Sequence, residues 1–121
     1  MPKQHLNPPS LFPSVRHGFS QVVVASGART VFISGQTAWD ANKKIVDRNL
    51  GEQTTQALSN VKTAVEAAGG NLRDIVSLRI YIVHQPEQNL APVGDALREV
   101  FPTDPPTSTW IGYRPWRFPI S

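Results

Sequence analysis

The sequence contains no cysteine in its 121 residues. That absence excludes disulfide frameworks, thiolate zinc sites and cysteine nucleophiles together. A chain without thiols is typical of a reducing compartment, and we therefore predict a cytoplasmic protein. A chain of this length corresponds to one domain and can close one hydrophobic core without covalent staples.

Long apolar runs are also missing. The N-terminal stretch lacks the apolar segment of a signal peptide, and no later run approaches the length that spans a bilayer. We expect a protein that is neither exported nor membrane-bound.

Strong catalytic motifs are absent as well: there is no HExxH, GxSxG, P-loop, strand-linked GxGxxG or EF-hand loop. The three histidines, His5, His17 and His84, have no metal-ligand spacing, so the sequence predicts no metal site.

The charge balance is weakly basic. The sequence pI is about 9.7 and the net charge is +3, with basic residues scattered along the chain. A nucleic-acid-binding surface would gather them on one face or in one run. We therefore predict no nucleic-acid partner.

Periodicity predicts an α+β chain. Residues 1–15 hold four of the eleven prolines and are interpreted as an extended lead-in without a regular element. The remaining patterns predict a β-hairpin of 19–25 with 30–35, a helix from Asn49 to the Gly69-Gly70 stop, a strand at 74–83, a helix from Asn89 to Val100 and a strand at 107–111. We expect an antiparallel-rich mixed sheet with both helices on one face, and self-association over the other.

Several residues are candidates for a binding site, each with a structural alternative. Ser34 and Gly35 end a predicted strand and could line a pocket, or simply form a turn. Arg79 lies in an apolar strand and could hold an anion, although an interface ion pair is the commoner role. Trp39, Trp110 and Trp116 could stack on a planar ligand, or pack in the core or an interface.

Six segments follow one another at characteristic spacing: His-Gly-Phe-Ser-Gln at 17–21, Val-Phe-Ile-Ser-Gly-Gln at 31–36, the helix at 53–61, Ala-Ala-Gly-Gly at 67–70, the strand at 74–81 and Pro-Pro-Thr-Ser-Thr at 105–109. On these segments the chain resembles the RidA/YjgF family, also called L-PSP, over roughly residues 15–112. The resemblance implies a chorismate-mutase-like fold, a homotrimer built around a barrel of sheets, and small-molecule clefts between subunits. It also implies hydrolysis of enamines and imines derived from amino acids, without metal or organic cofactor.

Three positions depart from the family pattern. Thr107 stands where the family has a carboxylate-binding arginine, Phe19 where it has a tyrosine, and Gly94 where it has an asparagine. The resemblance thus points to a divergent subfamily, with the pocket expected at Phe19, Ser34, Gly35, Gly94, Thr107 and Trp110 and no catalytic residue assigned. Two alternatives to a deaminase stay open: a non-catalytic ligand-binding or protein-protecting trimer, and the ribonuclease activity in the L-PSP name.

The C-terminal segment 113–121 does not resemble the family, which continues there with an alternating strand. For one choice of codons, restoring one nucleotide after the Gly112 codon yields a more family-like continuation, so a frameshift is one hypothesis for this tail. We therefore predict a lead-in at 1–15, one domain at 16–112 and an atypical tail at 113–121.

Overall fold

The computed structural model describes residues 3–27, 29–38, 42, 49–83 and 89–113. Within these ranges the chain is α+β, as predicted. Its elements are β1 (Lys3–Leu6), the 3₁₀ helix η1 (Val15–His17), β2 (Val22–Ala25), α1 (Leu50–Ala67), the 3₁₀ helix η2 (Leu72–Asp74), β3 (Ser77–Val83), α2 (Ala91–Val100) and β4 (Thr107–Tyr113). The predictions for Trp39, His84, Trp116 and the tail after Tyr113 concern residues outside the described ranges.

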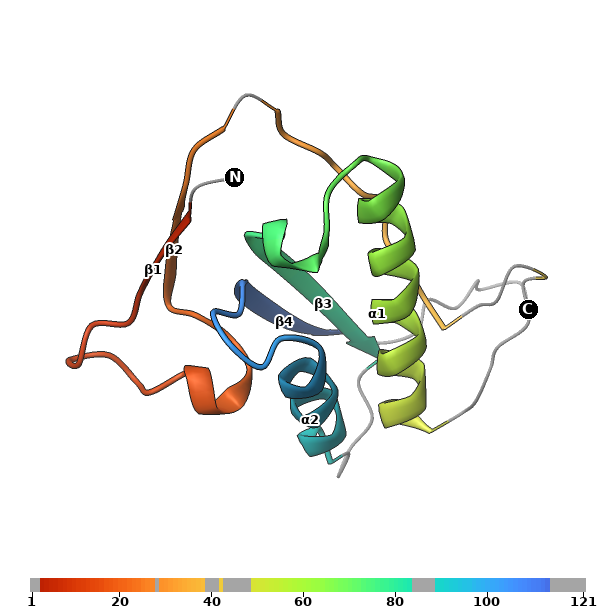
Figure 1. The fold of residues 1–121 in the computed structure, drawn as a ribbon. Coiled ribbons are helices and arrows are strands. Elements are labelled where there is room, and N and C mark those ends of the chain that lie inside the picture. The colour runs from red at the N-terminus through yellow and green to blue at the C-terminus, as the bar shows by residue number, and fades with distance from the viewer. Residues whose placement is uncertain (1–2, 28, 39–41, 43–48, 84–88, 114–121) are drawn as a thin grey trace.

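The described strands form two separate pairs. β1 and β2 are antiparallel, with Lys3 opposite Ala25, and β3 and β4 are parallel, with Ser77 beside Thr107 and Val83 beside Tyr113. In Figure 1 the β1–β2 ribbon stands to the left, away from β3 and β4, which lie among the helices. The predicted single mixed sheet is therefore wrong for the described residues.

The predicted hairpin is also wrong, because β2 pairs with the N-terminal segment instead. Residues 29–38 carry no strand, whereas the lead-in contributes β1. Two side-chain hydrogen bonds hold the 29–38 segment against α1 and its C-terminal end. Arg29 Nη2 donates to Ala68 O and Asn60 Nδ2 donates to Thr37 O, both at 2.9 Å. The segment is thus attached to α1 at both ends and arcs away from β2 (Figure 1).

Helix α1 begins and ends as its sequence predicts. The Asn49 side chain accepts hydrogen bonds from the backbone N–H groups of Gly51 and Glu52, which helix geometry leaves without carbonyl partners. Gly69 follows the last turn with φ of +87°, a conformation that glycine adopts without steric cost.

Helix α2 starts two residues after the predicted N-cap. Asn89 Oδ1 still accepts from Ala91 N at 3.0 Å, so the asparagine satisfies a free donor of the first turn. Pro92 is tolerated in that turn because its missing N–H would have no helical partner there.

The core lies between the two helices and one face of β3. Its buried residues are Leu58, Ile82, Val93, Ala96, Leu97 and Phe101, with Leu78 and Ile80 packed against them. Ser77, Arg79 and Tyr81 alternate with the inward residues and are exposed. Both helices therefore cover the same face, as predicted, and the opposite face of β3 is open among the described residues.

Candidate functional site

A cleft of about 790 Å³ lies where η1, the first turns of α2 and β4 meet. Its lining combines aromatic, aliphatic and charged side chains: Phe12, Arg16, His17, Phe19, Leu90, Ala91, Gly94, Asp95, Arg98, Ser108 and Trp110. A concave, mostly apolar surface with a few convergent polar groups is the usual form of a small-molecule site. This cleft is our candidate functional site.

The wall formed by residues 14–20 is fixed against the rest of the molecule. Ser14 and Ser20 are each only 1% exposed, and Ser20 N donates to Pro106 O at 2.9 Å. Gly18 has φ of +91°, and a Cβ on it would stand 3.1 Å from Leu97 Cβ. Glycine therefore permits both the backbone turn after η1 and its close approach to α2.

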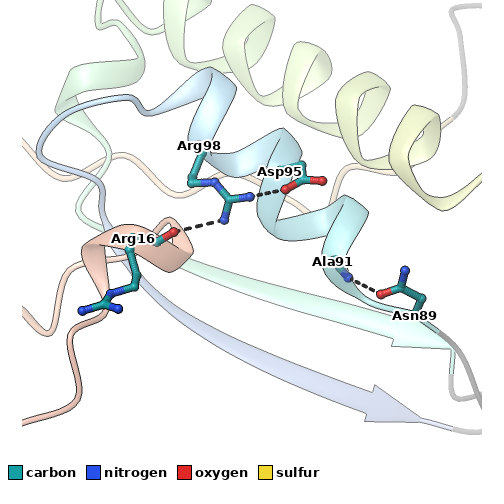
Figure 2. A network of polar contacts seen from close by, with 5 residues as sticks. All are labelled: Arg16, Asn89, Ala91, Asp95 and Arg98. Atoms are coloured by element: carbon teal, nitrogen blue, oxygen red, sulfur yellow. Dashed lines mark hydrogen bonds and ion pairs between the residues drawn. The ribbon is translucent and has the colours of Figure 1, made fainter.

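Arg98 joins the two sides of the cleft (Figure 2). Its Nη1 donates to Arg16 O at 3.1 Å, and its Nη2 pairs with the carboxylate of Asp95 one turn earlier on α2. The guanidinium of Arg16 itself points away from α2 in Figure 2. Arg98 is thus the cation whose position in the cleft is set by contacts to both α2 and η1.

The apolar wall is formed around Trp110. Its Nε1 donates to Ser108 Oγ at 3.2 Å, which orients the indole on β4. A Cβ placed on Gly94 would lie 3.5 Å from Arg98 Nη1 and 4.0 Å from Trp110 Cη2. The missing side chain at Gly94 therefore leaves open the point that the guanidinium and the indole both border.

His17 and Phe12 complete the rim. Their rings stack with centroids 5.0 Å apart and an interplanar angle of 23°. Phe12 is 59% exposed, so the apolar rim of the cleft is open to solvent.

Of the six predicted pocket residues, the structure brings three into this cleft: Phe19, Gly94 and Trp110. Ser34 and Gly35 instead line a second groove of about 1370 Å³, bounded by the 29–38 segment, α1 and β3, to which Arg79 also contributes. A Cβ on Gly35 would meet no atom within 4 Å, so nothing in this groove requires glycine there.

Thr107 lines neither space. Its backbone N and its Oγ1 both donate to Val76 O at 3.1 Å, at the start of the β3–β4 ladder. Since neighbouring strand residues point to opposite faces, Thr107 and Thr109 face away from the side that carries Ser108 and Trp110. The residue at the family's arginine position thus has a local structural contact and does not reach the cleft.

Sequence reasoning missed the charged residues of the cleft. Arg16, His17, Asp95 and Arg98 were not among the expected pocket positions, yet all line it. The one available signal was the placement of Asp95 and Arg98 three residues apart beside Gly94, a spacing that puts both on one face of a helix.

Two other polar sites near the β1–β2 ribbon have structural roles. Ser20 Oγ donates to Pro105 O and is hydrogen-bonded to His5 Nδ1 at 3.0 Å. Lys3 Nζ contacts the carbonyls of Arg73 and Ile75, and its burial lowers the pKa of the ammonium. Among the residues that the structure describes, no cluster of three His, Asp or Glu side chains could hold a metal ion.

The geometry defines a small α+β protein with two helices on one face of its core strands and a cleft beside the second helix. The sequence model of the family described as Endoribonuclease L-PSP matches residues 11–115. The chain therefore belongs to the RidA/YjgF/L-PSP family.

Individual relatives agree with this assignment. The chain is 36% identical to YyfB, a Rid-family protein of unknown function from Yersinia pestis, whose crystal structure matches with a TM-score of 0.88 over 98% of this chain and 91% of that one. A Mycobacterium tuberculosis member of the YjgF/YER057c/UK114 family is 22% identical, with a TM-score of 0.58 over 98% of this chain and 90% of that one, and shares the fold.

Two curated proteins match over nearly the whole chain. The 2-iminobutanoate/2-iminopropanoate deaminase of Dermatophagoides farinae is 28% identical over 92% of this chain and 84% of its own length. The mitochondrial protein mmf1 of Schizosaccharomyces pombe is 29% identical over 93% of this chain, which spans only 65% of that relative. Among the residues that the structure describes, no helix is long and apolar enough to cross a membrane.

Proposed function

We propose that this chain binds a small imine or enamine in the cleft between η1, α2 and β4 and hydrolyses it. The observation that carries the proposal is the convergence in one cleft of three residues expected at the pocket: Phe19 and Gly94, which stand at family positions, and Trp110, a candidate for stacking on a planar ligand. The name of the mite relative, an iminobutanoate and iminopropanoate deaminase, supports the same class of substrate.

The reaction requires water and a proton donor. Water oxygen bonds to the carbon of the C=N group, the nitrogen gains protons, the C–N bond breaks, and a carbonyl compound and ammonia leave. His17 and Asp95 are the proton-transferring groups that line the cleft, and Asp95 is 65% exposed and open to water. They are the candidates for moving the proton to the leaving nitrogen.

The test is imine loss and ammonia release when an amino-acid oxidase generates imines in the presence of the protein. Gly94→Leu places a branched side chain between Arg98 and Trp110, so we expect it to abolish the acceleration. Ser59→Leu introduces the same leucine side chain at an exposed position of α1, outside the cleft, and serves as the control. Imine loss at the same rate with and without protein, or unchanged by Gly94→Leu, would contradict the proposal.

A second candidate is a ligand-binding protein without turnover. It is favoured by Thr107, whose hydroxyl is held by Val76 O and cannot provide the charged contact of the family's arginine, and by Phe19, which has no hydroxyl. Saturable binding in the cleft without ammonia release would support this function over hydrolysis. The ribonuclease activity in the family's name is a third possibility, tested by incubation with RNA.

We further propose that the working form is a homotrimer with the cleft near a subunit interface. The exposed apolar side chains support association: Phe32 is 90% exposed, Tyr81 59% and Val24 50%. A cytoplasmic location also stays a prediction, and the name of the fission-yeast relative, a mitochondrial protein, is a reason to test it by fractionation.

A further inference from the structure

The cleft holds one guanidinium that is well placed to receive a ligand. Arg98 uses two of its N–H groups in the contacts to Arg16 O and Asp95, and a guanidinium has five. Its side chain is 43% exposed, and Nη1 borders the opening over Gly94. Donors therefore remain on a cation whose position is already fixed.

An aromatic surface borders the same opening. Trp110 Cη2 and Arg98 Nη1 both lie within 4.0 Å of the point where a Cβ of Gly94 would stand. Phe19, Phe12 and Leu90 extend the apolar wall. A single small molecule can therefore contact the guanidinium with an anionic group while its ring packs on the indole.

We propose that Arg98 is the anion anchor of this cleft and that its ligands are carboxylates carrying a planar ring, such as 2-imino acids with aromatic side chains. The inference rests on the proposed function in using the same cleft, and it adds the anchor and the ligand class. Arg98 is a binding residue in this scheme and takes no part in proton transfer.

Replacing Asp95 is expected to change carboxylate binding in the direction opposite to replacing Arg98. Its carboxylate is paired with Arg98 Nη2, so it competes with an incoming carboxylate for the guanidinium and repels it. Both partners are substantially exposed, at 43% and 65%, and solvent screens the pair. Replacing Asp95 by asparagine preserves the shape of the side chain and removes the competing charge.

The experiment measures binding of three stable probes to the full chain by NMR, through the indole N–H resonance of Trp110, which a Trp110→Phe variant identifies. The probes are 3-phenylpropanoate, which has ring and charge, 3-phenylpropanamide, which has the ring alone, and butanoate, which has the charge alone. We expect 3-phenylpropanoate to bind about tenfold more tightly than either of the others.

The variants separate the anchor from general electrostatics. Arg98→Gln is expected to weaken 3-phenylpropanoate about fivefold and leave the amide unchanged, whereas Asp95→Asn is expected to tighten the carboxylate about two- to fivefold. Arg73→Gln removes the same charge from η2, outside the cleft, and is the matched control. If Arg98→Gln and Arg73→Gln weakened 3-phenylpropanoate binding equally, or if Asp95→Asn weakened it, Arg98 would not be the anion anchor. If butanoate bound as tightly as 3-phenylpropanoate, the cleft would have no preference for a ring.

Arg98 also contacts Arg16 O, so circular dichroism is used to check that Arg98→Gln keeps its structure. If that variant loses structure, the binding measured for Asp95→Asn decides whether Arg98 is the anchor, because this variant retains the arginine. The experiments distinguish failure of the proposed hydrolysis from failure of the proposed Arg98 anchor. Probe binding that follows the expected pattern without ammonia release supports the anchor and contradicts hydrolysis. Imine turnover that Arg98→Gln does not alter supports hydrolysis and contradicts the anchor.

Discussion

Gly18 is the residue at which the wall of the cleft depends most directly on backbone geometry. Its φ of +91° is a conformation that residues with a side chain rarely adopt, and the left-handed region costs roughly 1–2 kcal/mol per residue other than glycine. A Cβ there would also stand 3.1 Å from Leu97 Cβ, inside a core where Leu97 is 1% exposed. Forcing extra volume into a packed core costs roughly 1–3 kcal/mol.

We therefore expect Gly18→Ala to lower the free energy of unfolding by about 2–5 kcal/mol, the combined cost of strain and crowding. Urea denaturation followed by far-ultraviolet circular dichroism, at one fixed protein concentration, measures it. Gly35→Ala is the matched control: a Cβ there meets nothing within 4 Å, so we expect a change below about 1 kcal/mol. If the two variants were equally stable, the assigned role of Gly18 would be refuted.

Two further predictions concern the start of α1 and the assembly. Asn49→Ala removes the acceptor for Gly51 N and Glu52 N and is expected to cost about 1 kcal/mol in the same urea assay, whereas Asn49→Asp, which keeps an acceptor, is expected to cost less; equal losses would contradict the capping role. Light scattering is expected to give three times the 13.3 kDa chain mass, and Phe32→Ser, at a side chain 90% exposed within one chain, is expected to lower it; a monomeric mass at assay concentration would refute the trimer.

The elements with local signals were predictable from the sequence. The helical period of α1 agrees with its Asn49 cap and Gly69 stop, and the strand predicted at 74–83 contains β3, whose inner face carries Leu78, Ile80 and Ile82. These signals act between residues three or four apart in a helix, or two apart in a strand. They do not depend on where the rest of the chain lies.

Strand pairing was not predictable in the same way, because the partner of a strand is chosen by tertiary contacts. Val22–Ala25 had an apparent partner in 30–35 a few residues away, yet it pairs with Lys3–Leu6. The proline-rich lead-in gave no periodic signal for β1. The hydrogen bonds that attach Arg29 and Thr37 to α1 come from side chains and carry no sequence period.

The residues of the candidate site also differ in whether the sequence alone could identify them. Phe19 and Gly94 could be assigned to a pocket because they sit at family positions, and Trp110 because an indole can stack on a planar ligand. Arg98 and Arg16 could not, since their role depends on η1 packing against α2. Ser34 and Gly35 occupy another groove because the segment that carries them follows α1 and does not pair with β2. A pocket position transfers between relatives only where the backbone that presents it is also retained.

At each of the three family positions where this chain departs from the pattern, a polar or charged group is lost. Relative to the family pattern, threonine replaces arginine at 107, phenylalanine replaces tyrosine at 19, and glycine replaces asparagine at 94, so a charge, a hydroxyl and an amide are all lost. Of these, Phe19 and Gly94 lie in the cleft and make it more apolar and more open beside Trp110. A ligand in the cleft has fewer polar groups to contact and more room for a ring beside the indole. The guanidinium of Arg98, held by Arg16 O, is then the cation available to it. The changes at Phe19 and Gly94 thus support the proposed preference of the cleft for larger, ring-bearing anions.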